Sequence, residues 1–273
     1  MTIRRHAREA FPSKAYGSDE PLRTTCAMAV MAKASIAGRT KTRLVPPLTE
    51  GEAALLNTAF LRDAADSILS AASLADICGW MAYAPAGAEA FFRTHLPDSI
   101  GLIETVRPTL GECLCYAAAT LLGAGHGAVC LINSDSPTLP VGYLVLAARA
   151  LSGSGDRIVL GPATDGGYYL IGMRRLHAGL FEGISWSTDR VLSETLARAA
   201  DLGLPVVSLP SWYDVDDTGT LQTLIGEVLD GKPYRATDAA APAAWTRAHL
   251  AELTREAALR ERLISRRTAS GAA

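Results

Sequence analysis

Short apolar runs alternate with longer amphipathic segments along most of the chain, and this alternation predicts the elements of the fold. The first run, residues 26–32, is apolar throughout, as is typical of a strand that is buried on both faces of a parallel sheet. A helical pattern extends from Thr49 to Ala72, where Thr49 and Glu52 form the sequence of a capping box. The apolar stripe expected for this helix consists of Leu55, Leu56, Ala59, Phe60 and Leu69.

The same alternation continues to residue 229. Strands are predicted at 77–83, 100–106, 128–132, 157–160, 168–173 and 205–209. Helices are predicted at 88–95, 111–123, 141–151, 188–201 and 218–229. Strands that alternate with helices indicate an α/β fold, in which a Rossmann-like, mostly parallel sheet is flanked by helices.

Changes in composition divide the chain into three parts. Residues 1–24 are polar and aperiodic, which favours a flexible leader. Residues 25–232 contain the α/β pattern and form the expected catalytic domain. Residues 233–273 are Ala-rich and carry apolar residues at helical spacing, which predicts a helical extension. We expect this extension to pack either on the domain or on a partner subunit, as in a homodimer.

The composition excludes several classes of protein. Hydrophobic residues make up 49% of the chain and charged residues 20%, which is enough apolar material to exclude general disorder. A formal net charge of −2 argues against a nucleic-acid-binding protein. No apolar run reaches the ~20 residues that a membrane span requires. The 5 cysteines are scattered without a zinc-site pattern, and the N-terminus lacks the apolar stretch of a signal peptide. These features favour a cytoplasmic protein.

A basic segment follows the first predicted strand, where open α/β sheets bind their ligands. It contains Lys33, Arg39, Lys41 and Arg43, with Gly38 giving the backbone freedom. If the segment is extended, alternate residues put the last three cations on one face. Such a cluster suits a polyanion such as a triphosphate. The order of a Walker A loop is absent, and a solvated basic loop is the alternative.

Carboxylates follow two other strands. Asp135, preceded by Ser134, comes directly after the run 128–132, where a hard cation such as Mg²⁺ can bind together with substrate phosphates. Capping of a turn is the alternative role for Asp135. Asp214, Asp216 and Asp217 come after the last predicted strand. A cation would relieve their mutual repulsion, but a helix starting at residue 218 would stabilise them too.

A glycine-rich segment precedes the strand at 168–173. Gly166 and Gly167 after Asp165 permit a tight turn and the close approach of a ligand. Tyr168 and Tyr169 point to opposite faces of a strand, so that one can line a pocket while the other joins the core. A simple hairpin turn explains the Asp-Gly-Gly sequence equally well.

Five segments in this order resemble the DUF2064 family of GT-A-like nucleotide-diphospho-sugar transferases, relatives of 2-phospholactate guanylyltransferase. The resemblance covers about residues 26–230. The matching segments are Lys33 with 38–44, 134–140, 161–170, Trp186-Ser187-Thr188 and Asp214-Val215-Asp216. The chain departs from the pattern at Ala34, where the family commonly has proline. It also departs at Asp217-Thr218-Gly219-Thr220, which replaces T-P-E-D.

The resemblance implies a GT-A fold with a nucleotide half and an acceptor half. It implies that the nucleotide phosphates are bound by Lys33, Gly38, Arg39, Lys41, Arg43 and Ser134. It assigns the metal, Mg²⁺ or Mn²⁺, to Asp135 and Asp216, and the acceptor to Asp165, Gly166, Gly167 and Tyr168. Lys41, Arg43 and Asp135 are the expected catalytic residues.

Two reactions suit this scaffold. A nucleotidyltransferase moves a nucleoside monophosphate from a nucleoside triphosphate to a small phosphorylated, sugar-phosphate-like acceptor and releases pyrophosphate. A glycosyltransferase instead starts from a nucleotide-sugar. Because the basic cluster exceeds what glycosyl transfer needs, we favour nucleotidyl transfer. The second alternative is a catalytically silent nucleotide-binding protein that retains the fold.

Overall fold

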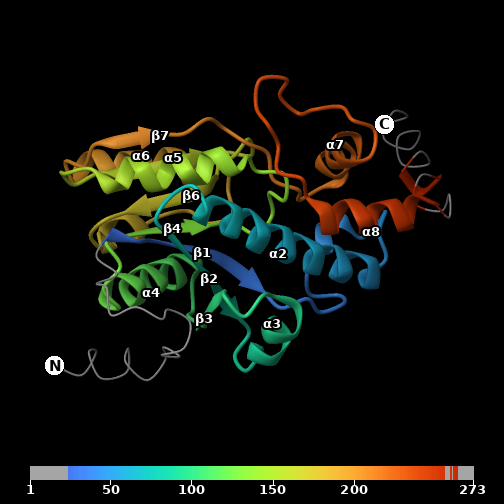
Figure 1. Ribbon diagram of the computed structural model, residues 1–273, viewed down its shortest axis with the longest axis horizontal. Helices are drawn as coiled ribbons and strands as arrows, with labels where there is room; N and C mark the ends of the chain where they lie inside the picture. Colours follow the sequence, from blue (N-terminus) through green and yellow to red (C-terminus); the bar gives the residue numbers. More distant parts are fainter. Residues whose placement is uncertain (1–23, 256–258, 260, 264–273) are drawn as a thin grey trace.

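The computed structural model describes residues 24–255, 259 and 261–263, which form a sheet covered by helices on both faces (Figure 1). The strands are β1 (Cys26–Lys33), β2 (Ile77–Ala84), β3 (Gly101–Glu104), β4 (Ala128–Ile132), β5 (Ile158–Pro162), β6 (Tyr168–Met173) and β7 (Val206–Ser208). The α-helices are α2 (Glu50–Ala72), α3 (Glu89–His95), α4 (Leu110–Gly123), α5 (Val141–Ser152), α6 (Val191–Asp201), α7 (Thr218–Val228) and α8 (Ala244–Arg255). Two 3₁₀ turns complete the set, η2 (Thr42–Leu44) and η3 (Ala178–Phe181).

The sheet has the strand order β3-β2-β1-β4-β6-β5-β7. The first four strands of that order pair in parallel, and β7 is parallel to β5. β6 runs antiparallel to both β4 and β5. The expected mostly parallel α/β sheet is therefore confirmed, with β6 as the exception. As a result, the start of β6 lies at the same edge of the sheet as the ends of β4 and β5.

Two hydrophobic cores form because successive side chains of a strand point to opposite faces. In β1, Met28 and Val30 belong to the core that includes residues of α2, α5, α7 and α8, whereas Ala27 and Ala29 belong to the core beneath α4 and α6. This burial on both faces explains why β1 is apolar at nearly every position.

The predicted elements are present, and most of their ends agree within a few residues. β4 and β6 coincide with their predicted ranges. The capping box of α2 is formed, since Glu52 N–H donates to Thr49 Oγ1 and Thr49 N–H donates to Glu52. One position of the apolar stripe was wrong. Leu55 is 60% exposed, because a helix turns about 100° per residue and Leu56, beside it, takes the buried direction.

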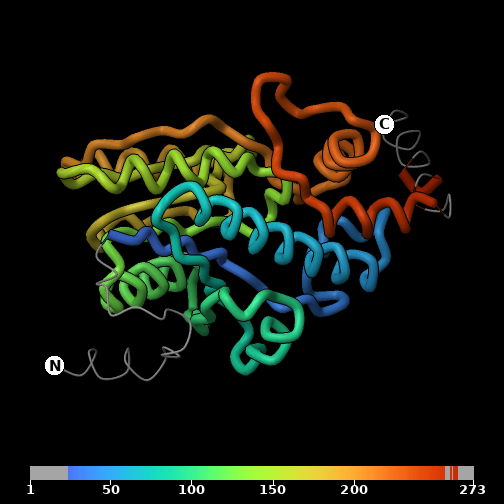
Figure 2. The backbone as a smooth tube through the Cα atoms, viewed as in Figure 1, coloured from blue at the N-terminus to red at the C-terminus, as the bar shows by residue number. Residues whose placement is uncertain are grey.

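The helical extension packs on its own domain along α2, as Figures 1 and 2 show. The Asp63 carboxylate of α2 accepts hydrogen bonds from the backbone N–H groups of Trp245 and Thr246, and so caps the start of α8 from outside that helix. Leu250 of α8 is fully buried in the same core as α2. The predicted leader, apart from residue 24, and the end of the extension lie outside the described residues. Within the described residues, no helix is long and apolar enough to span a bilayer.

Candidate active site

A cavity of about 1030 Å³ opens at the carboxyl edge of the sheet. Its lining comes from the ends of β1 and β4, the start of β6, and the segments that follow β5 and β7. The wall is completed by residues 186–189 ahead of α6, by Val191 at its start, by the start of α4, and by Arg43 and Thr220. The volume suits a nucleotide-sized ligand, and the position is the one where open α/β sheets bind ligands.

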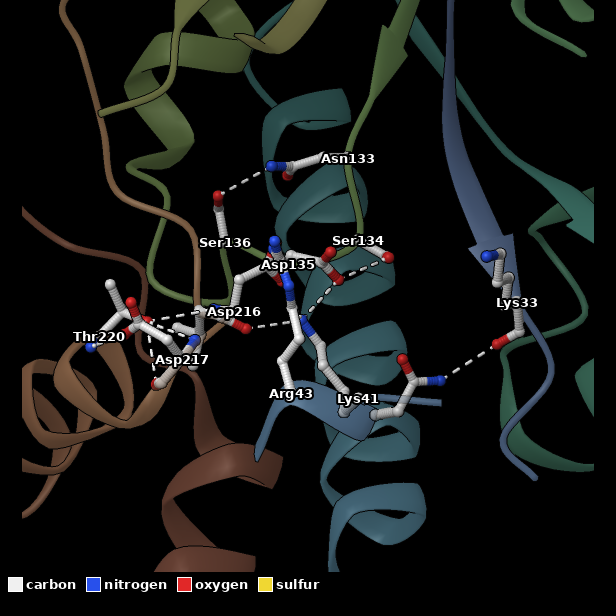
Figure 3. Close-up of polar contacts among 12 residues, drawn as sticks. Lys33, Lys41, Arg43, Asn133, Ser134, Asp135, Ser136, Asp216, Asp217 and Thr220 are labelled. Carbon is white, nitrogen blue, oxygen red and sulfur yellow. Dashed lines mark hydrogen bonds and ion pairs between the residues drawn. The ribbon is translucent and has the colours of Figure 1, made fainter. Parts of the chain in front are cut away.

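Lys41 connects three separate segments beside this cavity (Figure 3). Its Nζ lies 2.9 Å from Asp135 Oδ1 and 3.3 Å from Asp216 Oδ1, and it donates to the Val215 carbonyl at 2.7 Å. The Lys41 side chain is only 5% exposed, and its ammonium lies 5.1 Å from the centre of the Phe60 ring. The structure therefore brings together Lys41, Asp135 and Asp216, which the sequence had placed in three distant segments.

The rest of the basic segment does not form the expected extended face. The chain turns at residues 37–39, Lys41 has a left-handed backbone with φ 52°, and η2 follows, so alternate cations do not share one side. Arg43 still reaches the cluster, with Nη1 3.5 Å from Asp216 Oδ2. Arg39 is exposed and does not line the cavity. Lys33 lies apart from the cluster at the end of β1 (Figure 3).

The turn after β4 positions Asp135. The backbone carbonyl of Asp135 accepts a hydrogen bond from Val215 N–H, which ties this turn to the segment after β7. Ser134 Oγ donates to Asp135 Oδ1 at 2.8 Å, so Ser134 orients the carboxylate in this structure. The Asp135 side chain is 30% exposed. Because these contacts hold the Asp135 carboxylate against Lys41, capping of a turn does not describe its environment.

The three carboxylates after β7 have three different environments. Asp217 caps α7, because its Oδ1 accepts the Thr220 N–H at 2.8 Å, and this hydrogen bond lowers the pKa of Asp217. Asp216 pairs with Lys41 and Arg43. Asp214 is 9% exposed and lines the cavity. The helix start that was weighed against cation binding thus accounts for Asp217 alone.

Asp214 is in a strongly negative environment. Burial, and after it the neighbouring carboxylates of Asp165, Asp216 and Asp135, together raise the pKa of Asp214 to about 7. Among the described residues that line the cavity, Arg43 is the only cation, whereas five aspartates contribute to the wall. The cavity therefore favours cations, or anions that arrive with a cation.

The glycine-rich segment forms a turn at the far side of the cavity. Asp165 Oδ1 accepts the Gly167 N–H at 2.8 Å, and Asp165, Gly167 and Tyr168 line the cavity. Gly166 has φ +91°, and a Cβ there would lie 2.2 Å from the carbonyl oxygen of Asp189. Gly166 therefore lets two backbone segments approach each other and is outside the lining.

Tyr169 is fully buried in the core and also borders the cavity. Its hydroxyl donates to the Pro210 carbonyl at 2.9 Å, and its ring lies beside that of Tyr143. Tyr168 and Tyr169 belong to the cores on opposite faces of the sheet, as the strand period predicts, but both border the cavity, so the expected division into one pocket residue and one core residue is not seen.

Several lining residues were absent from the sequence-based site. Trp186, which the sequence had placed in a family motif but not in a site, packs its indole against Gly111, where a Cβ would lie 2.8 Å from Nε1. Asp189 and the apolar residues Leu110 and Leu114 also line the cavity. The family motif around Trp186 could have indicated that this residue belongs to the site. Leu110 and Leu114 could not have been identified, because their spacing indicates only an amphipathic helix.

Residues 67–188 match the DUF2064 family model, described as an uncharacterized protein conserved in bacteria. No curated protein matches the chain. The crystal structure of a proposed nucleotide-diphospho-sugar transferase from Desulfovibrio desulfuricans G20 is similar, with 27% identity, a TM-score of 0.73, and coverage of 88% of this chain and 98% of that one.

Other solved structures are similar to this chain at much lower sequence identity. A CMP:2-keto-3-deoxy-manno-octonic acid synthetase complexed with CTP has 10% identity and a TM-score of 0.48, over 76% of this chain and 100% of the other. A cytidylyltransferase from Leptospira borgpetersenii has 12% identity and a TM-score of 0.46, over 75% of this chain and 87% of the other. Similarity at this level carries no argument about the reaction.

The family and the fold expected from the five sequence segments are thus confirmed. Residues 67–188 of this chain match the DUF2064 family model and lie within a nucleotide-diphospho-sugar transferase-like α/β fold.

Proposed function

We propose that this protein is a divalent-metal-dependent transferase that transfers a nucleoside monophosphate from a nucleoside triphosphate to a small phosphorylated acceptor. The observation that carries this proposal is the position of the Lys41 ammonium. It is held between the carboxylates of Asp135 and Asp216 beside a cavity of about 1030 Å³. Cations and carboxylates gathered at one point suit a metal-assisted reaction of phosphates.

The donor set of Asp135 and Asp216 fits a hard divalent cation. Both are oxygen ligands, their side chains are 30% and 36% exposed, and both already contact a cation, the ammonium of Lys41. Among the described residues no group of three or more His, Cys, Asp or Glu side chains has the arrangement of a complete protein metal site. Two carboxylates suffice for Mg²⁺ or Mn²⁺ when substrate phosphates supply further ligands. A bound metal would neutralise charge on the phosphates as the leaving group departs.

The side chains of the chain itself have distinct roles in this proposal. An oxygen of the acceptor phosphate bonds to the α-phosphorus, the bond from that phosphorus to the bridging oxygen breaks, and pyrophosphate leaves with the electron pair. Lys41 and Arg43 stabilise the negative charge that collects on the leaving group. Lys33, Gly38, Arg39 and Ser134 remain proposed contacts of the nucleotide, and Asp165 with the adjoining turn remains the proposed acceptor side.

Glycosyl transfer from a nucleotide-sugar is the second candidate. The specific observation in its favour is that Arg43 is the only cation of the basic segment in the cavity lining, because Arg39 and Lys33 lie elsewhere. The number of cations that argued for nucleotidyl transfer is therefore smaller in the cavity wall than in the basic segment of the sequence. The D. desulfuricans relative is also described as a nucleotide-diphospho-sugar transferase.

The two candidates release different products. Purified protein is incubated with Mg²⁺ or Mn²⁺, each nucleoside triphosphate and a panel of sugar phosphates, and pyrophosphate is measured. Release with at least one pairing is the expected result. Release of nucleoside diphosphate from nucleotide-sugars would support glycosyl transfer instead. Tight, metal-independent nucleotide binding without either product would support a silent binding protein and contradict both enzymes.

A further inference from the structure

The turn that carries Asp135 and the segment that carries Asp216 are joined by hydrogen bonds from residues beside the two carboxylates. Val215 N–H donates to the Asp135 carbonyl at 2.9 Å. Ser136 Oγ donates to the Tyr213 carbonyl at 2.9 Å. Both of these hydrogen bonds are accepted by backbone carbonyls, so they hold the two stretches of chain side by side without involving α7.

The Tyr213 side chain adds a third link and extends it to α7. Its hydroxyl accepts a hydrogen bond from Thr138 Oγ1 at 3.0 Å and donates one to Glu227 Oε2 at 2.6 Å. Tyr213 is 2% exposed and Thr138 is 1% exposed. Because α7 follows directly on the segment that carries Asp216, this link connects the helix after Asp216 with the turn after Asp135.

The packing of the Tyr213 ring does not require its hydroxyl. The ring lies among aromatic side chains, with centres 5.9 Å from Trp212 and 4.6 Å from Tyr234, where phenylalanine would fill nearly the same space. A buried hydroxyl costs free energy unless it is hydrogen-bonded. The other oxygen of Glu227 accepts the Tyr234 N–H at 3.2 Å, which holds the carboxylate in place for Tyr213. The specific contribution of the hydroxyl is therefore the connection between α7 and Thr138.

A metal ion shared by two carboxylates requires a closely defined separation between them. Mg²⁺ binds oxygen at about 2.1 Å in a nearly ideal octahedron. The side chains of Asp135 and Asp216 are 30% and 36% exposed, so burial does not fix their positions. Their separation depends instead on their contacts with Lys41 and on the hydrogen bonds that join the two stretches of backbone.

We propose that Tyr213 is a positioning residue, whose hydroxyl holds the Asp135 turn against α7 and so sets the separation of the Asp135 and Asp216 carboxylates for one divalent ion. This inference rests on the proposed function, because it takes these two carboxylates as the metal ligands. Thr138 and Glu227 are the hydrogen-bond partners of Tyr213 in this role. Tyr213 is outside the cavity lining and takes no part in bond making or breaking.

Binding of Mn²⁺ alone tests this role apart from turnover. Electron paramagnetic resonance measures free Mn²⁺ in the presence of the full-length protein, and Asp135→Asn identifies the binding that belongs to this site. Tyr213→Phe removes both hydrogen bonds of the hydroxyl and keeps the ring, so we expect it to weaken the Asp135-dependent binding at least about tenfold. Tyr83→Phe, a change of a buried tyrosine of β2 outside the cavity lining, should leave the binding unchanged.

Variants of Glu227 separate the hydrogen bond from a general loss of stability. Glu227→Gln retains an oxygen that can accept the Tyr213 hydroxyl, so its Mn²⁺ affinity should stay within about threefold of the wild type, whereas Glu227→Ala should lose about as much affinity as Tyr213→Phe. When Tyr213 is already phenylalanine, Glu227→Ala should have little further effect, because the link is already absent. Thermal melting shows which variants fold, and the two Glu227 variants test the inference even if Tyr213→Phe does not.

Failure of this inference and failure of the proposed function give different results. A folded Tyr213→Phe protein with wild-type Mn²⁺ affinity overturns the inference, as does an equal loss in Glu227→Gln and Glu227→Ala; pyrophosphate release by the wild type then still supports the transferase. If Mn²⁺ affinity changes as expected but no pyrophosphate appears with any donor and acceptor, the positioning role stands and nucleotidyl transfer is wrong. A wild-type protein without Asp135-dependent Mn²⁺ binding contradicts both the metal assignment and this inference.

Discussion

Protonation of His126 should destabilise the protein in mild acid. His126 is 4% exposed, between α4 and β4, and its Nδ1 lies 2.7 Å from Thr25 Oγ1. Its ring contacts Trp80 edge-on, with the ring centres 5.8 Å apart, and Nε2 has no hydrogen-bond partner among the described residues. Burial lowers the pKa of His126 from 6.5 to about 4, because the charged imidazolium loses its hydration there.

The sign and size of the effect follow from this pKa. The unfolded chain binds a proton near pH 6.5, and the folded protein does so only near pH 4, so stability falls as the pH falls between those values. At about 1.4 kcal/mol for each tenfold change in proton affinity, the free energy of unfolding drops by about 2 kcal/mol at pH 5 and about 3 kcal/mol at pH 4. Above about pH 7 His126 is neutral in both states, so its ionisation does not change the free energy of unfolding there.

Urea unfolding at pH 7 and pH 5 measures this effect. His126→Asn is the matched control, because its amide can keep a hydrogen bond to Thr25 but does not titrate. All other groups titrate in both proteins, so the difference in stability between wild type and variant should move by about 2 kcal/mol toward the variant at pH 5. A difference that stays constant between the two pH values would refute the reasoning.

Three further predictions concern the candidate active site and its supporting turn. Asp135→Asn should keep the fold, since the side chain is partly exposed, but lower turnover at least about 100-fold; near-full activity would mean that the metal assignment is wrong. Lys41→Ala should raise the KM for the nucleotide and lower kcat, because it removes the cation that contacts both Asp135 and Asp216. Both constants are measured by steady-state kinetics with the best substrate pair, and unchanged values would contradict this role. Gly166→Ala should lower the free energy of unfolding by about 1–3 kcal/mol, because its φ is +91° and the new methyl group would meet the Asp189 carbonyl; an unchanged urea midpoint would show that the turn can shift freely.

The order of strands and helices could be predicted because it depends on local pattern. A run such as residues 128–132 is apolar at each position, and a sheet covered on both faces is the environment in which such a run is stable. The Thr49 capping box also depends only on residues close in sequence. The short turn between β5 and β6 indicates an antiparallel pair, as the hairpin alternative had it. The insertion of β6 between β4 and β5 could not be predicted, because it depends on pairing across the sheet.

The types of residue that follow each strand could be identified without the structure. Asp135 after an apolar run and the acidic group after the last strand were both visible, and the rule that strand ends share one edge placed them near each other. The environment of each carboxylate became known only from the fold. Asp217 caps a helix, Asp216 pairs with Lys41, and Asp214 is buried against the cavity. Burial and charge partners come from segments far apart in the chain, and a local sequence pattern does not indicate which of these segments will be in contact.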